Sequence, residues 1–174
     1  MIKTAYFAGG CFWCITPVFK EAEGVLSVVS GYAGGDEINP TYEDVKNQKT
    51  GHRETICVEY DDEKISYDEL FMIYLGGIDP YDAGGQFIDR GHSYTLAVYY
   101  TDEAQREISE EKIKWAEEKC GQKLAISVEA FKNFYPAEEY HQDYYLKNPE
   151  AFEKELVESG RKNQHEELTL SEPS

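Results

Sequence analysis

The stretch FAGGCFWC at residues 7–14 begins at the end of an apolar run over residues 2–7 and combines two glycines, two thiols and three large aromatics. Adjacent glycines let the backbone turn sharply and let another molecule approach closely. The Cys11 thiol, placed in such a turn, can project from the domain beside the aromatic surface of Phe12 and Trp13. Cys, Phe and Trp are usually buried in a core, but their density next to two glycines favours a functional site.

Length and charge limit what the chain can be. Its 174 residues suit one domain with a substantial core. We expect a single catalytic domain over residues 1–158 and, where the composition turns polar and charged, a C-terminal tail over residues 159–174. The 34 acidic and 17 basic residues give a net charge of −17, which disfavours nucleic acid as a partner.

The sequence contains no membrane or export signal that we recognise. No apolar run reaches the length of about 18 residues that a transmembrane helix needs. The first residues lack the apolar core and the cleavage site of a signal peptide. We therefore expect a cytoplasmic protein that makes no use of a membrane.

Hydrophobic periodicity predicts strands interspersed with helices. Strands are expected at residues 2–7, 25–32, 53–60, 94–101 and 124–131, and helices at 42–48, 66–75, 102–120 and 134–146. Thr41, Ser66 and Asp102 are expected to cap the first three of these helices, and Gly121 is expected to end the third. A further helix should begin with Thr16 as its N-cap and Pro17 as its first residue, because proline is tolerated in a first turn. Residues 76–93 read as a long loop, which in a compact domain is often functional. This order predicts an α/β or α+β domain with a mixed sheet.

One acid stands out in this pattern. In the strand expected at residues 53–60, Ile56, Val58 and Tyr60 share one face, and Glu54 lies on the same face. A carboxylate in that place is either part of a frayed strand end or a functional acid.

The four cysteines suggest a catalytic pair. In a reducing cytosol Cys11, Cys14, Cys57 and Cys120 would not form a structural disulfide framework. We expect no metal site, because there is no second C-x-x-C and the four histidines are scattered. Cys57 and Cys120 are interpreted as structural. Cys14 is either a small buried hydrophobic residue or a second redox thiol.

The run Gly9–Trp13 resembles the signature of the A-type peptide methionine sulfoxide reductases. Further segments resemble that family in the same order, namely 30–35, 39–42, Gly51-His52 with Glu54, Asp89 and Gly91 with Tyr94, and Glu139-Tyr140-His141-Gln142. The matches extend from about residue 5 to about residue 146. We therefore expect an α+β fold, a two-layer sandwich with a mixed sheet built as a ferredoxin-like plait with additions.

The resemblance implies a role for each matching residue. Cys11 would attack the sulfoxide sulfur, and Glu54 would protonate the sulfoxide oxygen. Tyr42 and Tyr94 would hydrogen-bond that oxygen, and Asp89 would help to organise the site. Each role suits the reaction, since a sulfoxide is a poor electrophile until its oxygen is protonated or hydrogen-bonded. Without the family match, such acids would be read as surface charges and such tyrosines as core-edge residues.

The resemblance also implies a substrate and a reaction sequence. Phe12 and Trp13 would form the aromatic wall that receives the methyl group of a methionine sulfoxide, with the family's preference for the S epimer. Attack would leave a sulfenic acid on Cys11, and no cofactor is expected. Thioredoxin or another thiol reductant would complete the cycle.

The route of recycling stays open. Many family members carry a resolving cysteine near the C-terminus, but this chain has none beyond Cys120. Cys14, where the family often has glycine, is the first choice as the resolving thiol. Direct attack on the sulfenic acid by an external thiol is the alternative.

Two other functions fit parts of the sequence. A thioredoxin-like disulfide oxidoreductase could use the C-x-x-C at residues 11–14, but such folds place a cis-proline before a strand, and Pro40, Pro80 and Pro136 precede loop or helix patterns. A binding module could use the surface of Phe12 and Trp13, although that leaves the thiol unexplained.

Overall fold

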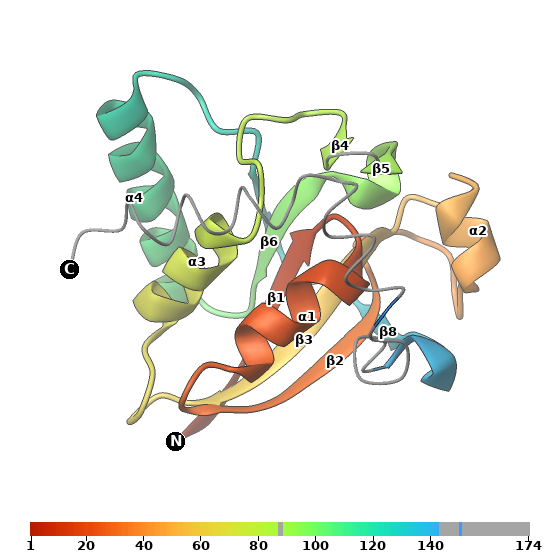
Figure 1. Ribbon diagram of the computed structural model, residues 1–174, viewed down its shortest axis with the longest axis horizontal. Coiled ribbons are helices and arrows are strands. Elements are labelled where there is room, and N and C mark those ends of the chain that lie inside the picture. Colours follow the sequence, from red (N-terminus) through yellow and green to blue (C-terminus); the bar gives the residue numbers. More distant parts are fainter. Residues whose placement is uncertain (87–88, 143–149, 151–174) are drawn as a thin grey trace.

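The protein is a mixed six-stranded sheet with helices packed on one face (Figure 1). The computed structural model describes residues 1–86, 89–142 and 150. Its elements, in chain order, are β1 (Ile2–Gly9), α1 (Phe12–Lys20), β2 (Val25–Ala33), α2 (Tyr42–Lys46), β3 (Arg53–Asp61), α3 (Tyr67–Gly76), β4 (Gly85–Gln86), β5 (Asp89–Arg90), η1 (His92–Tyr94), β6 (Leu96–Tyr100), α4 (Glu103–Cys120), β7 (Ser127–Ala130), β8 (Phe134–Pro136) and η2 (Glu139–His141).

The sheet has the order β7-β6-β1-β3-β2-β8. The central strand β1 is antiparallel to both β3 and β6, and β2 is antiparallel to β3 and to β8. Only the β6–β7 pair among the described strands is parallel. The α+β class with a mixed sheet is therefore confirmed.

The main core lies between the sheet and helices α1 and α3. Alternate side chains of each strand point to the helices, so Phe7 of β1 and Ile56 of β3 are fully buried against Phe19 of α1 and Phe71 of α3. The ring of Phe7 stacks on that of Phe19 with a centroid distance of 5.2 Å. This packing fixes α1, and hence the FAGGCFWC stretch, against the end of β1.

A smaller apolar cluster lies on the reverse face of the sheet. Ala33, Ala97 and Tyr99 are buried there, and Phe134 packs against them with Tyr6. The Tyr6 ring also stacks on Phe131 at a centroid distance of 4.3 Å. The reverse face is thus partly covered by the chain that follows β7.

Three predicted helix starts are confirmed by their capping side chains. Thr41, Ser66 and Asp102 each accept a hydrogen bond from a backbone N–H in the first turn of the helix that follows. Gly121 ends α4 in the left-handed conformation, with φ of 70°. These starts and stops depend on neighbours three or four residues away, which explains why the sequence predicts them well.

The predicted start of the first helix is wrong. Helix α1 begins at Phe12 with Cys11 as its N-cap, and Pro17 lies inside it. Proline removes only one intrahelical donor, and the preceding turn is stabilised by other bonds. The Cys14 N–H donates to the Cys11 carbonyl at 3.1 Å, and the Thr16 hydroxyl donates to the Phe12 carbonyl at 2.7 Å.

The helix predicted at residues 134–146 is also wrong over its described part. Residues Phe134–Pro136 form strand β8, and Glu139–His141 form a 3₁₀ turn. Pro136 lacks the N–H that a helix would use, and the Ala137 N–H donates to the Ser30 carbonyl at 2.8 Å. The backbone therefore pairs with β2 instead of with itself. Residues 143–146 and the tail at 159–174 lie outside the described residues.

Smaller differences concern the segment between α3 and β6 and the end of the sheet. The predicted loop at residues 76–93 carries two short strands, β4 and β5, which pair antiparallel. The strands predicted at 94–101 and 124–131 are shorter, Leu96–Tyr100 and Ser127–Ala130.

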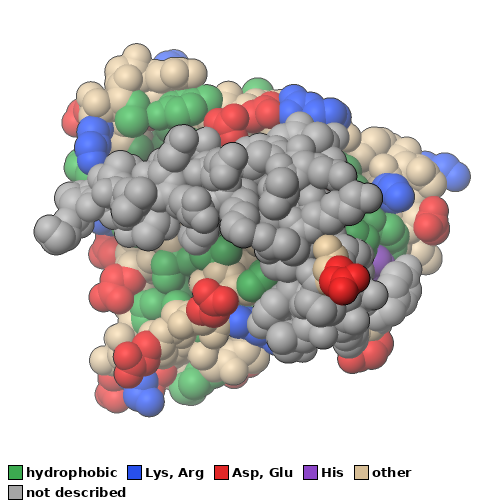
Figure 2. All heavy atoms as spheres, viewed as in Figure 1, with side chains coloured by type: hydrophobic (Ala, Val, Ile, Leu, Met, Phe, Trp, Pro, Cys, Tyr) green, Lys and Arg blue, Asp and Glu red, His purple; other side chains and the backbone are tan. Residues whose placement is uncertain are grey.

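On the face shown in Figure 2, acidic side chains are spread over the described surface, consistent with the net charge of −17.

Candidate active site

Cys11 lies at the junction of β1 and α1. Gly10 takes a φ of 85°, which favours glycine, and thereby turns the chain from strand to helix. At Gly9 an added Cβ would lie 2.4 Å from the Ile15 Cδ1 atom, so the strand end packs directly on α1. The Cys11 side chain is 5% exposed at the helix N-terminus. Because a helix N-terminus favours negative charge, this position stabilises a thiolate.

Glu54 lies beside the same helix end. Its side chain is 1% exposed and, as the strand alternation predicts, shares the helix-facing side of β3 with Ile56 and Val58. The Phe12 N–H donates to Glu54 Oε1 at 3.3 Å. The residue next to Cys11 is therefore bonded directly to the carboxyl, which places acid and thiol in one buried region.

The Tyr94 phenol interacts electrostatically with four other predicted site residues. Its pKa is raised above the ordinary value, first by burial and then by electrostatic interaction with Glu54, Tyr42, Cys11 and Asp89. The five side chains therefore lie near enough to interact electrostatically. A phenol with a raised pKa keeps its proton at neutral pH, so Tyr94 can donate a hydrogen bond there.

The two tyrosines come from segments that Gln48 ties together. Tyr42 begins α2, and Tyr94 ends η1. The Gln48 amide, just beyond α2, accepts from the Ser93 N–H at 3.1 Å and donates to the Ser93 hydroxyl at 2.7 Å. This pair of bonds holds η1 next to α2.

An aromatic cluster stands beside these polar groups. Trp13 stacks on Tyr42 and on His141 with centroid distances of 6.0 and 5.5 Å. Tyr42 and His141 approach to 4.1 Å, and Phe12 lies 5.5 Å from His141. Phe12 and Trp13 are thus part of a larger wall of four rings.

His141 is a candidate that the sequence did not single out. It lies in the quoted motif at 139–142, but a lone histidine in a motif carries no evident role. The Trp13 Nε1–H donates to His141 Nδ1 at 3.0 Å, across 128 residues of sequence. Burial lowers the pKa of His141, so the ring is neutral at pH 7, with its proton on Nε2.

Glu138 and Gln142 hold the His141 segment in place. The Glu138 carboxylate accepts from the Tyr32 hydroxyl at 2.8 Å and from the Tyr42 N–H at 3.2 Å. Burial opposes its ionisation, but these bonds lower the pKa of Glu138. The Gln142 amide pairs with the backbone N–H and carbonyl of Ser30, both at 2.9 Å.

The remaining thiols differ in position. None of the four cysteines forms a disulfide. Cys14 is 4% exposed and shares α1 with Cys11. Cys57 is half-buried in β3, where it contacts Tyr6 of the reverse face, and Cys120 is exposed at the end of α4.

Among the described residues, no three His, Cys, Asp or Glu side chains gather as a metal site. None of the described helices has the length and hydropathy to cross a membrane.

A buried thiol at a helix N-terminus, next to a carboxyl and to phenols that can donate, is the arrangement of an enzyme that uses cysteine as its nucleophile. The family model "Peptide methionine sulfoxide reductase" matches residues 3–172. The chain therefore belongs to the peptide methionine sulfoxide reductase family.

Individual relatives agree with this assignment. The chain is 46% identical over 161 residues to the peptide methionine sulfoxide reductase MsrA of Bacillus licheniformis, covering 91% of this chain and 89% of that protein. Among solved structures it is similar to reduced Mxr1 from Saccharomyces cerevisiae, with a TM-score of 0.80 and 31% identity over 86% of this chain and 87% of that one. It is also similar to Mxr1 in complex with Trx2, with a TM-score of 0.55 and 25% identity over 82% and 84% of the two chains.

Proposed function

We propose that this protein reduces methionine S-sulfoxide, free or in oxidised proteins, through attack by Cys11 on the sulfoxide sulfur. Membership of the family supports the reaction. Two observations support the residue assignment, namely the hydrogen bond from the Phe12 N–H, next to Cys11, to Glu54 at 3.3 Å and the electrostatic interaction of the Tyr94 phenol with Cys11, Glu54, Tyr42 and Asp89. Both support one site that holds the nucleophile, the acid and the hydrogen-bond donors.

In this proposal the polar groups activate the sulfoxide oxygen. Glu54 supplies a proton to it, Tyr42 and Tyr94 donate hydrogen bonds, and Asp89 helps to organise the site. Donors that are already in place when charge develops lower the barrier, because they need no reorganisation. The rings of Phe12 and Trp13 contact the methyl group and exclude water from it.

The proposed catalytic cycle has three steps. The Cys11 thiolate attacks sulfur, and the oxygen ends on Cys11 as a sulfenic acid while methionine leaves with the two electrons. A second thiol condenses with the sulfenic acid, which forms a disulfide and releases water. A dithiol reductant then reduces that disulfide.

Cys14 is the proposed resolving thiol. It lies in the first turn of α1, three residues after the N-cap Cys11, whereas Cys57 contacts the reverse face and Cys120 lies at the end of α4. The Cys14 N–H already donates to the Cys11 carbonyl at 3.1 Å across this turn. A disulfide, which needs Cβ atoms about 3.5–4.5 Å apart, would be accommodated in the same turn. The complex of yeast Mxr1 with Trx2 supports thioredoxin as the reductant.

A single-turnover experiment without reductant tests the proposal. Unmodified protein should convert one equivalent of methionine S-sulfoxide, and mass spectrometry should find a sulfenic acid on Cys11 or a disulfide that includes it. The Cys11→Ser variant should form no methionine, with a Cys120→Ser variant as the matched control that keeps full activity. Normal conversion by Cys11→Ser would contradict the proposal, and reduction of insulin disulfides instead would favour a thioredoxin-like function.

Three broader assignments are also proposals. The unit β1-α1-β2-β3-α3-β6 is a ferredoxin-like plait with additions, supported by the order β6-β1-β3-β2 and by its antiparallel pairs. One catalytic domain extends over residues 1–158, supported by the bond between Trp13 and His141. A reducing, cytoplasmic setting is supported by the four free thiols.

A further inference from the structure

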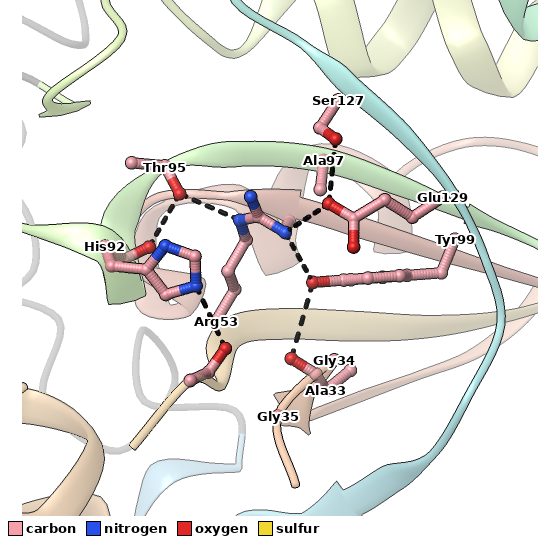
Figure 3. Close-up of polar contacts among 12 residues, drawn as sticks. Ala33, Gly34, Gly35, Arg53, His92, Thr95, Ala97, Tyr99, Ser127 and Glu129 are labelled. Atoms are coloured by element: carbon pink, nitrogen blue, oxygen red, sulfur yellow. Dashed lines mark hydrogen bonds and ion pairs between the residues drawn. The ribbon is translucent and has the colours of Figure 1, made fainter. Parts of the chain in front are cut away.

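Arg53 lies next to Glu54 in β3 but points to the opposite face of the sheet. Successive side chains of a strand alternate in this way. The Arg53 side chain is 12% exposed, and on the reverse face it is surrounded by acceptors from other segments (Figure 3). None of the roles discussed above uses it.

Three acceptors hold the Arg53 guanidinium. Its Nε donates to Thr95 Oγ1 at 2.8 Å, and its Nη1 donates to the Tyr99 hydroxyl at 2.9 Å and to Glu129 Oε2 at 2.8 Å (Figure 3). The planar fork of arginine fixes the directions of these bonds. Ser127 in turn donates to the same Glu129 oxygen at 2.7 Å. The guanidinium is therefore held in one orientation.

The bond to Thr95 joins the two segments that carry the proposed proton donors. Thr95 follows Tyr94 directly, as Arg53 precedes Glu54. The Thr95 hydroxyl donates to the His92 carbonyl at 2.6 Å and accepts from Arg53.

A second bond joins the same two segments. The His92 Nε2 atom lies 2.9 Å from the Gly51 carbonyl oxygen (Figure 3). The chain at 51–53 is thus tied to the chain at 92–95 from outside the site.

We propose that Arg53 is a positioning residue that aligns Glu54 with Tyr94 for activation of the sulfoxide oxygen. The proposal rests on the proposed function, in which both side chains act on that oxygen. Tyr94 ends a 3₁₀ turn of three residues, which has little regular structure to hold it. A displacement of about 1 Å can cost about 100-fold in rate. The Arg53–Thr95 bond lies one residue from Glu54 and one residue from Tyr94, so its loss should slow catalysis.

The Thr95→Val variant tests this tie, because valine matches the shape of threonine and removes the hydroxyl. We expect the single-turnover rate constant for methionine S-sulfoxide to fall about 10-fold, with the KM within about twofold. Thr95→Ser keeps the hydroxyl and should retain the rate of the unmodified protein. Glu129→Gln, which changes a half-exposed partner of the same guanidinium, should stay within about twofold.

A combined variant separates positioning from a general effect on the fold. A Glu54→Gln, Tyr94→Phe background lacks both groups that Arg53 is proposed to align, so adding Thr95→Val there should slow the residual reaction less than about twofold. An undiminished 10-fold effect in that background, or a normal rate for Thr95→Val alone, would overturn the proposal. If the unmodified protein reduced no sulfoxide, the proposed function itself would fail, which the same assay shows separately.

Discussion

Glu54 is a residue whose surroundings decide its chemistry. It is almost fully buried on an apolar strand face, which disfavours an isolated carboxylate, while the Phe12 N–H at 3.3 Å favours one. In the proposed mechanism this buried carboxyl is the group that supplies a proton to the sulfoxide oxygen. The position next to Cys11 then matters more than the residue type, since 34 acidic residues occur in the chain.

Replacing Glu54 by glutamine should slow the first reduction step about 10²–10⁴-fold, the usual contribution of a general acid. The amide keeps the shape and still accepts from Phe12, but it cannot supply a proton. Rapid-quench measurement of methionine formation in a single turnover gives the rate. Glu59→Gln, on the exposed side of the same strand, serves as the control. A Glu54→Gln rate within threefold of normal would mean that another group is the acid.

At the scale of elements, α1 and its N-cap carry four of the proposed site residues. Its N-terminus presents Cys11, its first turn carries Phe12, Trp13 and Cys14, and its buried face packs on the sheet. Because Pro17 lies inside the helix, the first turn depends on the Thr16 hydroxyl bond to Phe12. A turn with fewer regular bonds is suited to the local adjustment that a Cys11–Cys14 disulfide requires.

The Cys14→Ser variant should separate reduction from recycling. The first turnover should keep its normal rate, whereas steady-state turnover with thioredoxin should fall at least about 10-fold, because the sulfenic acid lacks an adjacent thiol. Labelling by dimedone should show that sulfenic acid. Cys57→Ser is the matched control and should behave normally. Unchanged steady-state turnover of Cys14→Ser would favour direct attack by the external thiol.

The site also depends on the pairing of strand β2 with strand β8. An added Cβ at Gly31 would lie 2.5 Å from the Tyr135 carbonyl oxygen and 2.4 Å from the Phe134 ring. Gly31→Ala should therefore lower the free energy of unfolding by about 1–3 kcal/mol and loosen the His141 segment.

Urea unfolding measures the first effect of Gly31→Ala. Hydrogen exchange of the Ala137 N–H, which bonds to Ser30, measures the second. Gly51→Ala is the control, since its added Cβ would meet its nearest neighbour at 3.6 Å. Equal stability of the two variants would show that β8 is not held in this way.

At the scale of the whole molecule, buried phenols and one buried imidazole set the pH range of stability. Burial raises the pKa of Tyr6 to about 12, and it raises the pKa of Tyr67 and of Tyr74 above the ordinary value. Burial lowers the pKa of His141. These shifts act in opposite directions along the pH scale.

Stability should be greatest between about pH 7 and pH 10. Above about pH 10 the unfolded phenols lose their protons while the folded ones keep them, so the folded state loses free energy relative to the unfolded state. Below about pH 6.5 the unfolded histidine gains a proton that folded His141 resists, which also favours unfolding. Urea midpoints measured from pH 5 to pH 11 check both limbs. A midpoint that stays constant from pH 9 to pH 11 would contradict the assignment of buried phenols.

Much of the architecture followed from local sequence patterns. The strands β1, β2 and β3, the caps at Thr41, Ser66 and Asp102, and the stop at Gly121 all depend on residues within a few positions of one another. The same alternation placed Glu54 on the helix-facing side of β3. Local patterns predicted the wrong structure where a distant strand supplied the hydrogen-bond partner. At Pro136 the following residue, Ala137, donates its N–H to the Ser30 carbonyl of β2.

The sequence by itself determined the reactive stretch at 7–14, the family to which it is similar, and the mixed α+β class. Only the tertiary structure decided that His141 joins the aromatic wall and that Arg53 ties Thr95 on the reverse face. Those contacts join residues 42 to 128 positions apart. A local pattern reports the bonds a segment can make with itself, whereas these bonds exist only after the sheet has brought distant segments together.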